Sequence, residues 1–435
     1  MPTDPLRGPR GFQGDRGPTG LTGPQGPQGA AEDPLTEADV KTLYESNPDT
    51  NSYPDADQAK VQHLSVTQDV DLDATEQKAS GALQKNQNLS DINDTEAARG
   101  NLGLGIYIPD SLRKSVETAT GGRITVLYDD LGQPSYMHVF PRNTYENLGY
   151  ATELGSGTLS AFDVGSGSFR SEVFIGVYPA VMRNNRACSL PSKDPEVNIN
   201  FDDARAACTA KGAGWHLYNR HEHAAVAFWC MINGFEPRGN TNDGSAHDAP
   251  HEVGITQGGG IPGGGGNRTL VGSGPLTWRH TGDPTGIADL VGNTWEWQDM
   301  LKLVDGQINC TPHNDPTIAE SAWDALGHYF SDDGSSPILQ NSPGNTTTDN
   351  VSINPWSGLA KASGYTESQL LNRLLVSPAS IAPQGRFYCR TQGERLPLAG
   401  GNWSSGGSAG LAALHCSDER SSTYNSIGFR PAFVS

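Results

Sequence analysis

The chain has 435 residues, a mass of 46.2 kDa and a formal net charge of −19. This length has room for two or three domains, and the acidic balance argues against a nucleic-acid or anionic-membrane binder, because both need basic patches. No apolar run approaches the ~18 residues of a membrane span, and the start lacks the apolar core of a signal peptide, so we expect neither membrane insertion nor signal-directed secretion.

A strict glycine repeat follows a short N-terminal tail (residues 1–6) and occupies residues 7–30. Glycine stands at every third position from Gly8 to Gly29, and proline follows four of these glycines. Only glycine fits the crowded axis of three wound polyproline-II chains, so the repeat predicts a collagen-like triple helix and a homotrimer. A disordered Gly/Pro linker is the alternative.

Residues 31–105 are acidic, with 15 acidic and five basic residues. Short helices are predicted at residues 36–46, 55–64 and 93–102, the first with Thr36 as its N-cap. The apolar residues of that first helix share one face: Val40, Leu43 and Tyr44. None of these helices is long enough to bury a core alone, so we expect a trimeric shaft that buries the apolar faces between chains. A solvated acidic linker is an equal alternative.

Residues 106–150 contain a predicted β-hairpin with its turn at residues 129–132. The alternating apolar positions of its two strands are Ile124, Val126 and Tyr128, then Tyr136, His138 and Phe140. The segment is interpreted as a small β connecting unit or as the beginning of the next domain.

Residues 151–435 hold all eight tryptophans and all six cysteines, and this segment is the expected globular domain. Helices are predicted at residues 201–211 and 220–233, among short strands and two irregular segments at 257–267 and 311–354. This mixture predicts an α+β domain. The scattered cysteines are interpreted as free thiols of a protein made in a reducing cytoplasm.

Metal and catalytic chemistry is sparse in this domain. His216, His221 and His223 do not have the spacing of a zinc site and are interpreted as surface or capping histidines. Residues 331–336 offer oxygen ligands for calcium, but their spacing matches no calcium-binding motif, so calcium is left unassigned. We expect no required cofactor. No carboxylate pair for glycan cleavage stands out. Trp295 and Trp297 have rings that stack on sugars, but a core role is favoured.

Three motifs resemble the formylglycine-generating-enzyme superfamily, which has a C-type-lectin-like fold. They are GIADLVGNTWEW at 286–297, the block at 201–240 with GWHL and GFEPRGN, and the terminal run at 400–431 that ends in IGFRP. The likeness is strongest to retroelement-diversified phage proteins of the major-tropism-determinant type. Residues 36–51 and 82–105 also resemble linker modules of phage tail fibres.

The resemblance implies a C-type-lectin-like domain on a trimeric fibrous stalk, built from the collagen-like helix and a short helical shaft. It implies a phage tail fibre that recognises a host cell-surface protein or glycan and joins other virion tail proteins through its N-terminal region. Such a protein is made in the host bacterial cytoplasm and resides in the virion. The fold-signature positions are Gly292, Asn293, Trp295, Trp297, Gly428, Phe429 and Arg430.

Residues 402–426 are rich in Ser, Gly, Ala, Asn and Tyr, a composition typical of adaptable binding surfaces. Carried over from the phage proteins, the receptor-binding or diversified positions are Ser404, Ser405, Ser408, Ala412, His415, Ser417, Asp418, Tyr424 and Asn425. Trp403 joins this set as an aromatic contact residue, although the resemblance places it in the scaffold. An ordinary terminal loop and strand is the alternative.

An enzyme on the same stalk is a second hypothesis. The two catalytic cysteines of the enzyme family align with Gly407 and Ala412, and Cys416 lies off that register, so the resemblance implies no oxidase. A capsule depolymerase, a formylglycine-type oxidase and a purely structural tail or adaptor protein remain as alternatives.

Overall fold

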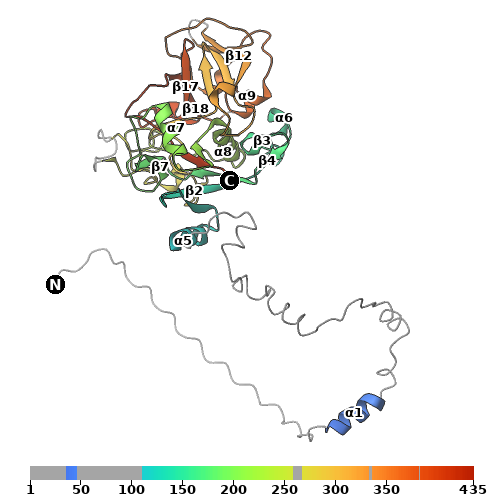
Figure 1. The fold of residues 1–435 in the computed structure, drawn as a ribbon. Coiled ribbons are helices and arrows are strands. Elements are labelled where there is room, and N and C mark those ends of the chain that lie inside the picture. Colours follow the sequence, from blue (N-terminus) through green and yellow to red (C-terminus); the bar gives the residue numbers. More distant parts are fainter. Residues whose placement is uncertain (1–35, 47–109, 258–266, 333–335, 382) are drawn as a thin grey trace, which may run out of the picture. The chain divides into compact units, whose positions relative to one another are not determined.

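The computed structural model describes residues 36–46, 110–257, 267–332, 336–381 and 383–435 (Figure 1). The collagen-like repeat, the helices predicted at 55–64 and 93–102 and most of the glycine-rich segment lie outside these residues. The chain divides into two units, Met1–Tyr107 and Ile108–Ser435, and each is described by itself.

The first unit contains the predicted helix as α1 (Glu37–Ser46). Thr36 is its N-cap, as predicted: Thr36 Oγ1 accepts from the Asp39 amide at 3.2 Å, and Asp39 Oδ2 accepts from the Thr36 amide at 2.9 Å. Val40 and Leu43 are more than half exposed, so the described residues of this chain do not cover the apolar face of α1.

The second unit combines helices with two main sheets, which confirms the mixed α+β prediction. Its helices are α5 (Ser111–Thr120), α6 (Ala151–Leu154), α7 (Phe201–Thr209), α8 (Arg220–Ile232) and α9 (Gln369–Arg373). Its 3-10 turns are η2 (Ser160–Phe162), η4 (Leu276–Trp278), η5 (Glu320–Ala322), η6 (Trp356–Gly358) and η7 (Gly406–Ser408). Its two small hairpins are β3 (Asp163–Gly165) with β4 (Ser168–Phe169), and β6 (Ala180–Arg183) with β7 (Arg186–Ser189).

The first sheet joins the beginning of this unit to the end of the chain. Its order is β1 (Ile124–Tyr128), β2 (Pro134–Pro141), β5 (Glu172–Gly176), β20 (Pro431–Phe433) and β8 (Trp215–Leu217). The predicted hairpin is confirmed, with Val126 opposite Tyr136. Because β2 pairs with β5 along five residues, the hairpin belongs to the same sheet as the later strands. It is therefore the beginning of this unit and not a separate connecting unit.

The second sheet carries the C-terminal stretch. Its order is β14 (Val351–Ile353), β16 (Phe387–Cys389), β18 (Gly410–Asp418), β17 (Glu394–Gly400), β10 (Leu301–Val304), β11 (Gln307–Cys310), β12 (Asp324–Asp332), β13 (Pro337–Gln340) and β15 (Ala360–Lys361). Beside this path, β9 (Trp295–Trp297) pairs with β17 and with β19 (Ile427–Gly428). The prediction of an irregular segment at 311–354 is wrong, because its residues build β12, β13 and β14. β13 and β14 are short, and the buried and exposed positions of β12 do not alternate regularly, so no period-of-two pattern marked these strands.

The two predicted helices of the domain are present as α7 and α8. Asn219 and Glu222 form a capping box that begins α8. Ten of the 13 residues of α8 are buried. A helix covered on nearly all sides lies in the interior, and α8 packs in the main hydrophobic core.

The fold-signature motifs meet through one buried ion pair. Arg430 donates to Glu296 Oε2 at 2.9 Å from Nε and to Oε1 at 2.6 Å from Nη2, and its Nη1 donates to the Gly176 carbonyl at 2.8 Å. Gly292 adopts a φ of 74°, and a Cβ there would lie 2.2 Å from the Asn240 carbonyl oxygen. Trp297 is fully buried and donates to the Ile199 carbonyl, so a core role for this tryptophan is confirmed.

The histidine interpretation is wrong, because His216, His221 and His223 are all buried. Their ring nitrogens lie 2.8 Å from Glu222 Oε1, 3.1 Å from Thr311 Oγ1 and 2.7 Å from the Leu411 carbonyl, respectively. Burial lowers the pKa of His221 to about 4 and that of His223 to about 3. These three histidines are therefore internal hydrogen-bonding residues.

The six cysteines are free and buried, in agreement with the free-thiol interpretation. Burial raises the pKa of Cys310 and of Cys416 to about 12, so both are protonated near neutral pH. No helix within the described ranges has the length and apolarity that a membrane crossing requires.

Candidate functional site

A small surface pocket at the end of β18, called here the His415 pocket, gathers several predicted binding residues. Its volume is about 220 Å³. Its lining residues are Trp295, Asn350, Arg390, Leu398, His415, Asp418, Tyr424, Ser426 and Ile427. Of the predicted receptor-binding residues, His415, Asp418 and Tyr424 are thus brought together.

Strand register builds an aromatic cluster at this pocket, in which Trp295 and His415 line the pocket and Tyr388 packs beside His415. Tyr388 on β16 is the parallel partner of His415 on β18, and their ring centroids lie 4.9 Å apart. The Trp295 ring on β9 lies 5.4 Å from the His415 ring and 6.2 Å from the Tyr388 ring. Three strands that are distant in sequence therefore place three rings in mutual contact.

An acid and a base lie on the pocket wall. His415 Nδ1 lies 3.0 Å from Asp418 Oδ2. Burial opposes ionisation of Asp418, but hydrogen bonding and charge from His415, with smaller contributions from Ser422 and Arg390, lower its pKa. Asp418 is therefore a carboxylate at neutral pH.

Polar groups from outside the terminal stretch complete the pocket. Asn350, which precedes β14, accepts from Ser417 Oγ at 2.6 Å through its Oδ1, and Arg390 Nη1 donates to the Ser417 carbonyl at 3.2 Å. Asn350 is exposed. The sequence interpretation missed Asn350, Arg390 and Tyr388, and for Trp295 it favoured a core role over sugar stacking. No local motif marks these residues, because the strand order alone brings them together.

The other predicted binding residues lie elsewhere. Ser404, Ser405 and Ser408 lie in the turn before β18 and do not line the His415 pocket. Ala412 and Ser417 have no exposed surface, so their side chains cannot touch a partner in this conformation.

Trp403 and Asn425 both contact Arg268. Trp403 is buried, and Arg268 Cζ lies 5.9 Å from its ring centroid. Arg268 Nη1 donates to the carbonyl of Asn425 at 3.0 Å, and the Asn425 residue is exposed. The predicted set is therefore divided between the turn before β18 and the His415 pocket at its end, while Ala412 and Ser417 are buried within β18 and Asn425 lies in neither group.

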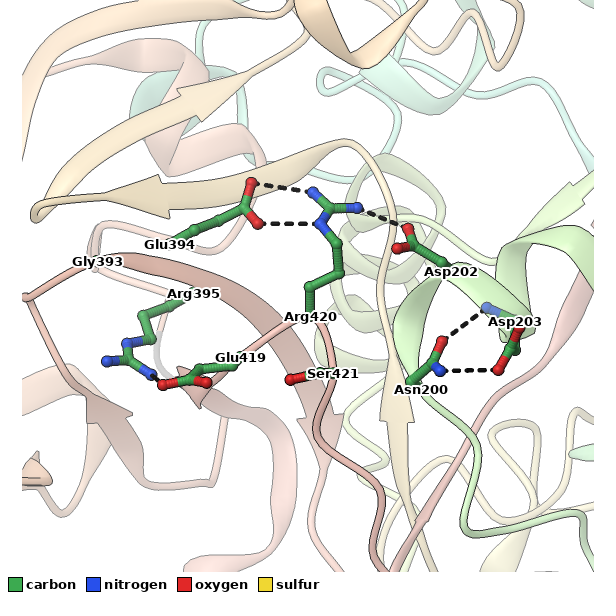
Figure 2. A pocket seen from close by; sticks show the side chains of 9 residues that line it. All are labelled: Asn200, Asp202, Asp203, Gly393, Glu394, Arg395, Glu419, Arg420 and Ser421. Atoms are coloured by element: carbon green, nitrogen blue, oxygen red, sulfur yellow. Dashed lines mark hydrogen bonds and ion pairs between the residues drawn. The ribbon is translucent and has the colours of Figure 1, made fainter.

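The terminal loop, residues 419–426, contributes residues to the His415 pocket and to a second one, called here the Arg420 pocket. Figure 2 shows this second pocket, whose volume is about 610 Å³. It is lined by Asn200, Asp202, Asp203, Gly393, Glu394, Arg395, Glu419, Arg420 and Ser421. Its two arginines are engaged internally: Arg395 Nη1 donates to Glu419 Oε1 at 3.0 Å, and Arg420 faces Glu394 and Asp202.

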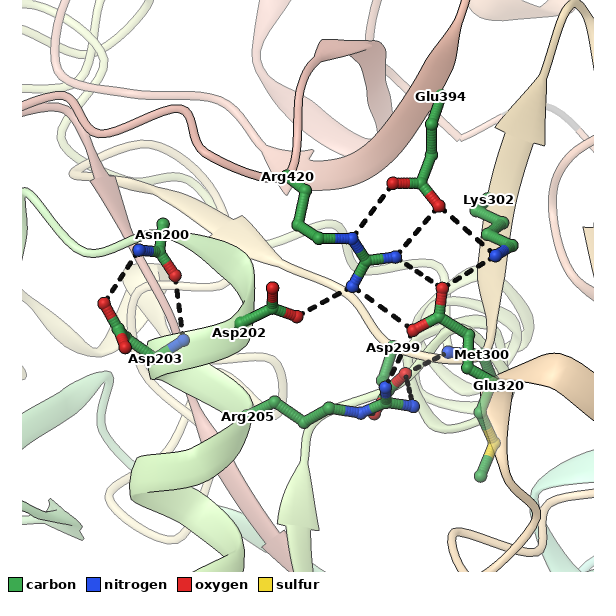
Figure 3. Close-up of polar contacts among 10 residues, drawn as sticks. All are labelled: Asn200, Asp202, Asp203, Arg205, Asp299, Met300, Lys302, Glu320, Glu394 and Arg420. Carbon is green, nitrogen blue, oxygen red and sulfur yellow. Dashed lines mark hydrogen bonds and ion pairs between the residues drawn. The ribbon is translucent and has the colours of Figure 1, made fainter.

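Arg420 is the centre of a charged network that reaches across four parts of the fold (Figure 3). It donates to Glu394 on β17 twice at 2.9 Å and to Asp202 on α7 at 2.7 Å, and it also contacts Glu320 in η5. Lys302 on β10 donates to Glu320 at 2.7 Å and to Glu394 at 3.2 Å.

A second arginine extends the network into the interior. Arg205 on α7 donates to Asp299 at 2.8 and 2.9 Å and to Glu320 at 3.0 Å (Figure 3). Hydrogen bonds from Arg420 lower the pKa of Glu394. For Glu320, burial opposes ionisation, but the hydrogen bonds from Lys302 and Arg420 outweigh it and lower the pKa. The network therefore ties the first residues of the terminal loop to the sheet and to α7.

The other end of the terminal loop is held through its backbone. The Tyr424 carbonyl accepts from the amides of Asn198 and Ile427, each at 3.0 Å. The Tyr424 side chain is 54% exposed. A fixed backbone with an exposed ring presents an aromatic contact at low cost in conformational entropy.

The positions aligned with the enzyme's cysteines are also described. Gly407 is exposed, whereas Ala412 and Cys416 are buried. Cys416 is the parallel strand partner of Cys389, which is buried too. Among the described residues, no group of three His, Cys, Asp or Glu side chains has a geometry that could hold a metal ion.

The chain matches no protein-family model and no curated protein sequence. Among solved structures it is similar to PvdO from Pseudomonas aeruginosa, at 13% identity and a TM-score of 0.32 over 71% of this chain and 97% of that chain. It is also similar to the Major Tropism Determinant U1 variant (12% identity) and P3c variant (14% identity), each at a TM-score of 0.28 over 71% of both chains. Because these identities and TM-scores are low, we infer neither fold nor function from them.

Proposed function

We propose that this chain is a receptor-binding protein of a phage tail fibre, and that it recognises a host bacterial surface receptor through the His415 pocket and the terminal loop. One observation carries the proposal. Three predicted contact residues, His415, Asp418 and Tyr424, meet in a surface pocket whose wall combines aromatic rings with hydrogen-bonding groups.

The proposed architecture follows the segments of the sequence. Three chains wind through the collagen-like repeat and the acidic shaft, and each ends in a C-type-lectin-like domain. The N-terminal region joins other tail proteins, and the protein resides in the virion. Three weak sites on one stalk gain avidity because binding of the first raises the effective concentration of the others. The net charge of −19 per chain opposes nonspecific adhesion to anionic bacterial surfaces.

Binding of the labelled full-length protein to a panel of bacterial strains tests this proposal. We expect saturable binding to a few strains and its loss in the Tyr424→Ala variant. The Ser404→Ala/Ser408→Ala variant is the matched control, because both serines belong to the predicted set but lie outside the His415 pocket. Loss of binding in the control alone would move the site to the turn before β18.

The oligomeric state gives an independent test. Light scattering of the full-length protein is expected to give the mass of three chains. A monomer would overturn the fibre architecture. Turnover of a cysteine peptide or clearing of a bacterial capsule, with no binding lost in the Tyr424→Ala variant, would favour the enzyme hypothesis instead.

A further inference from the structure

The wall of the His415 pocket offers an aromatic surface, a carboxylate and a guanidinium within one small volume. From these features we infer that the pocket binds a single neutral pyranose ring of a surface glycan. This inference rests on the proposed receptor-binding function and names the ligand class that the same site takes.

The size of the pocket fits a small, ring-shaped group. At about 220 Å³ it is smaller than the ~300–1,000 Å³ of pockets that enclose drug-sized ligands. Tyr424 and Asn350 are both exposed at this pocket, and Trp295 is more than nine-tenths buried. One sugar ring can therefore enter while the rest of a glycan chain stays in solvent.

The aromatic residues supply the apolar contact that a pyranose needs. One face of a pyranose ring carries C–H groups and packs on an aromatic ring, while its rim carries hydroxyls. The Trp295 and Tyr424 side chains line the pocket from different elements, and His415 lies against Trp295. Trp and Tyr combine an apolar body with a polar tip, so they suit such an amphipathic ligand.

The polar residues supply both donors and acceptors. Each sugar hydroxyl donates one hydrogen bond and accepts others, so it needs both kinds of partner. Asp418 is an ionised acceptor, and Arg390 is a donor. Asn350 accepts from Ser417 through its amide oxygen, and its NH₂ group is a further donor. Arg390 Nε is buried and has no hydrogen-bond partner among the described residues, so one donor of this pocket-lining residue is unpaired.

The charges of the pocket argue against a strongly charged ligand. A phosphate or carboxylate would meet the Asp418 carboxylate, and an ammonium group would meet the Arg390 guanidinium. Arg390 lies close enough to Asp418 to help lower the pKa of that carboxyl. A neutral polyhydroxyl ligand meets neither repulsion, and its hydroxyls use both groups.

The test compares glycan binding by the full-length protein and three variants. The probes are an array of immobilised neutral hexose glycans with matched uronic-acid glycans, and cells of a bound strain treated with periodate or with protease. Periodate cleaves the vicinal diols of sugars, and protease removes protein receptors. We expect binding to neutral glycans, loss of cell binding after periodate, and retention after protease.

The variants separate stacking from other effects. Tyr424→Ala removes an exposed ring and is expected to weaken glycan binding about tenfold or more, whereas Tyr424→Phe keeps the ring and most of the affinity. Thr423→Ala is the matched control, because Thr423 is an exposed neighbour that does not line the pocket. We expect it to bind as the unaltered protein does.

The outcomes distinguish the two proposals. Cell binding that protease abolishes and periodate leaves intact would keep the receptor-binding function and overturn the pyranose inference. Binding of equal strength to the uronic-acid glycans would overturn the preference for a neutral ring. Glycan binding that persists in Tyr424→Ala would show that the glycan binds elsewhere and would overturn the inference for this pocket. Absence of binding to every strain and every glycan would overturn both proposals.

Discussion

Two arginine centres of the domain use the same pairing chemistry in different surroundings. The Arg430 and Glu296 side chains are 0% and 5% exposed, and backbone carbonyls occupy further donors of Arg430. The Arg420 and Glu394 side chains are 27% and 34% exposed. The first centre joins the two signature motifs in the interior, and the second holds the terminal loop at the surface.

The difference between the two centres lies in desolvation. A buried charge that loses its partner has no water to replace it, so breaking such a pair costs several times more than breaking a hydrated one. We therefore expect the Arg430 centre to determine whether the domain folds, and the Arg420 network to determine where the terminal loop lies.

The Arg430→Met substitution is expected to have the largest effect. It leaves Glu296 buried without a partner and should lower the free energy of unfolding by about 3–5 kcal/mol. Urea denaturation followed by tryptophan fluorescence measures this loss. Combining it with Glu296→Leu removes both charges and is expected to restore part of the stability. A single variant within about 1 kcal/mol of the unaltered protein would contradict the comparison.

The Arg420→Ala substitution is expected to cost less, about 1–3 kcal/mol, because water partly replaces the lost hydrogen bonds of Glu394 and Glu320. It should also weaken cell binding, since the terminal loop loses its attachment to α7 and β17. Arg123→Ala is the matched control: the Arg123 side chain is 60% exposed and pairs with Asp283 at 3.4 Å. That control should change stability by less than about 0.5 kcal/mol.

Acidification is expected to erase the contribution of the Arg420 network. The folded-state pKa values of Glu394 and Glu320 are lowered, so these carboxylates stabilise the fold above the ordinary Glu pKa. This contribution is lost as the pH falls from about 4.3 through the folded-state values. The stability difference between the unaltered protein and Arg420→Ala should therefore shrink below about pH 4. A constant difference from pH 7 to pH 3 would show that the network is not electrostatic.

The Asp418→Asn substitution is expected to have the smallest effect on stability, about 0.5–1 kcal/mol, because it keeps the shape of the side chain and removes only its charge. The lowered pKa of Asp418 indicates that the folded state favours the ionised form. Thermal unfolding at pH 7 and at pH 3 measures the effect, which should be smaller at the lower pH, because the contribution is lost as the pH falls through the lowered folded-state pKa of Asp418. A loss as large as that of Arg430→Met would place Asp418 with the folding determinants.

Much of the local structure was predictable from residue patterns. The Thr36 cap, the hairpin around residues 129–132 and the helices α7 and α8 all arise from contacts within a few residues of the chain. Helix caps, turns and hydrophobic periodicity depend on residues that are only a few positions apart, so the sequence alone reveals them. The burial of His221 and His223 was not predictable in this way, because it depends on β-strands and turns about 90 and 190 residues further along the chain.

The amino-acid sequence by itself determined the segmentation of the chain, the glycine repeat, the acidic stretch, the main helices and the set of candidate contact residues near the C-terminus. Only the tertiary structure decided which of those residues share a pocket. His415, Asp418 and Tyr424 meet Trp295, Asn350 and Arg390 because β16 and β18 run parallel and β9 pairs with β19. Strand order and register arise from the burial of the whole sheet, and no local pattern records them.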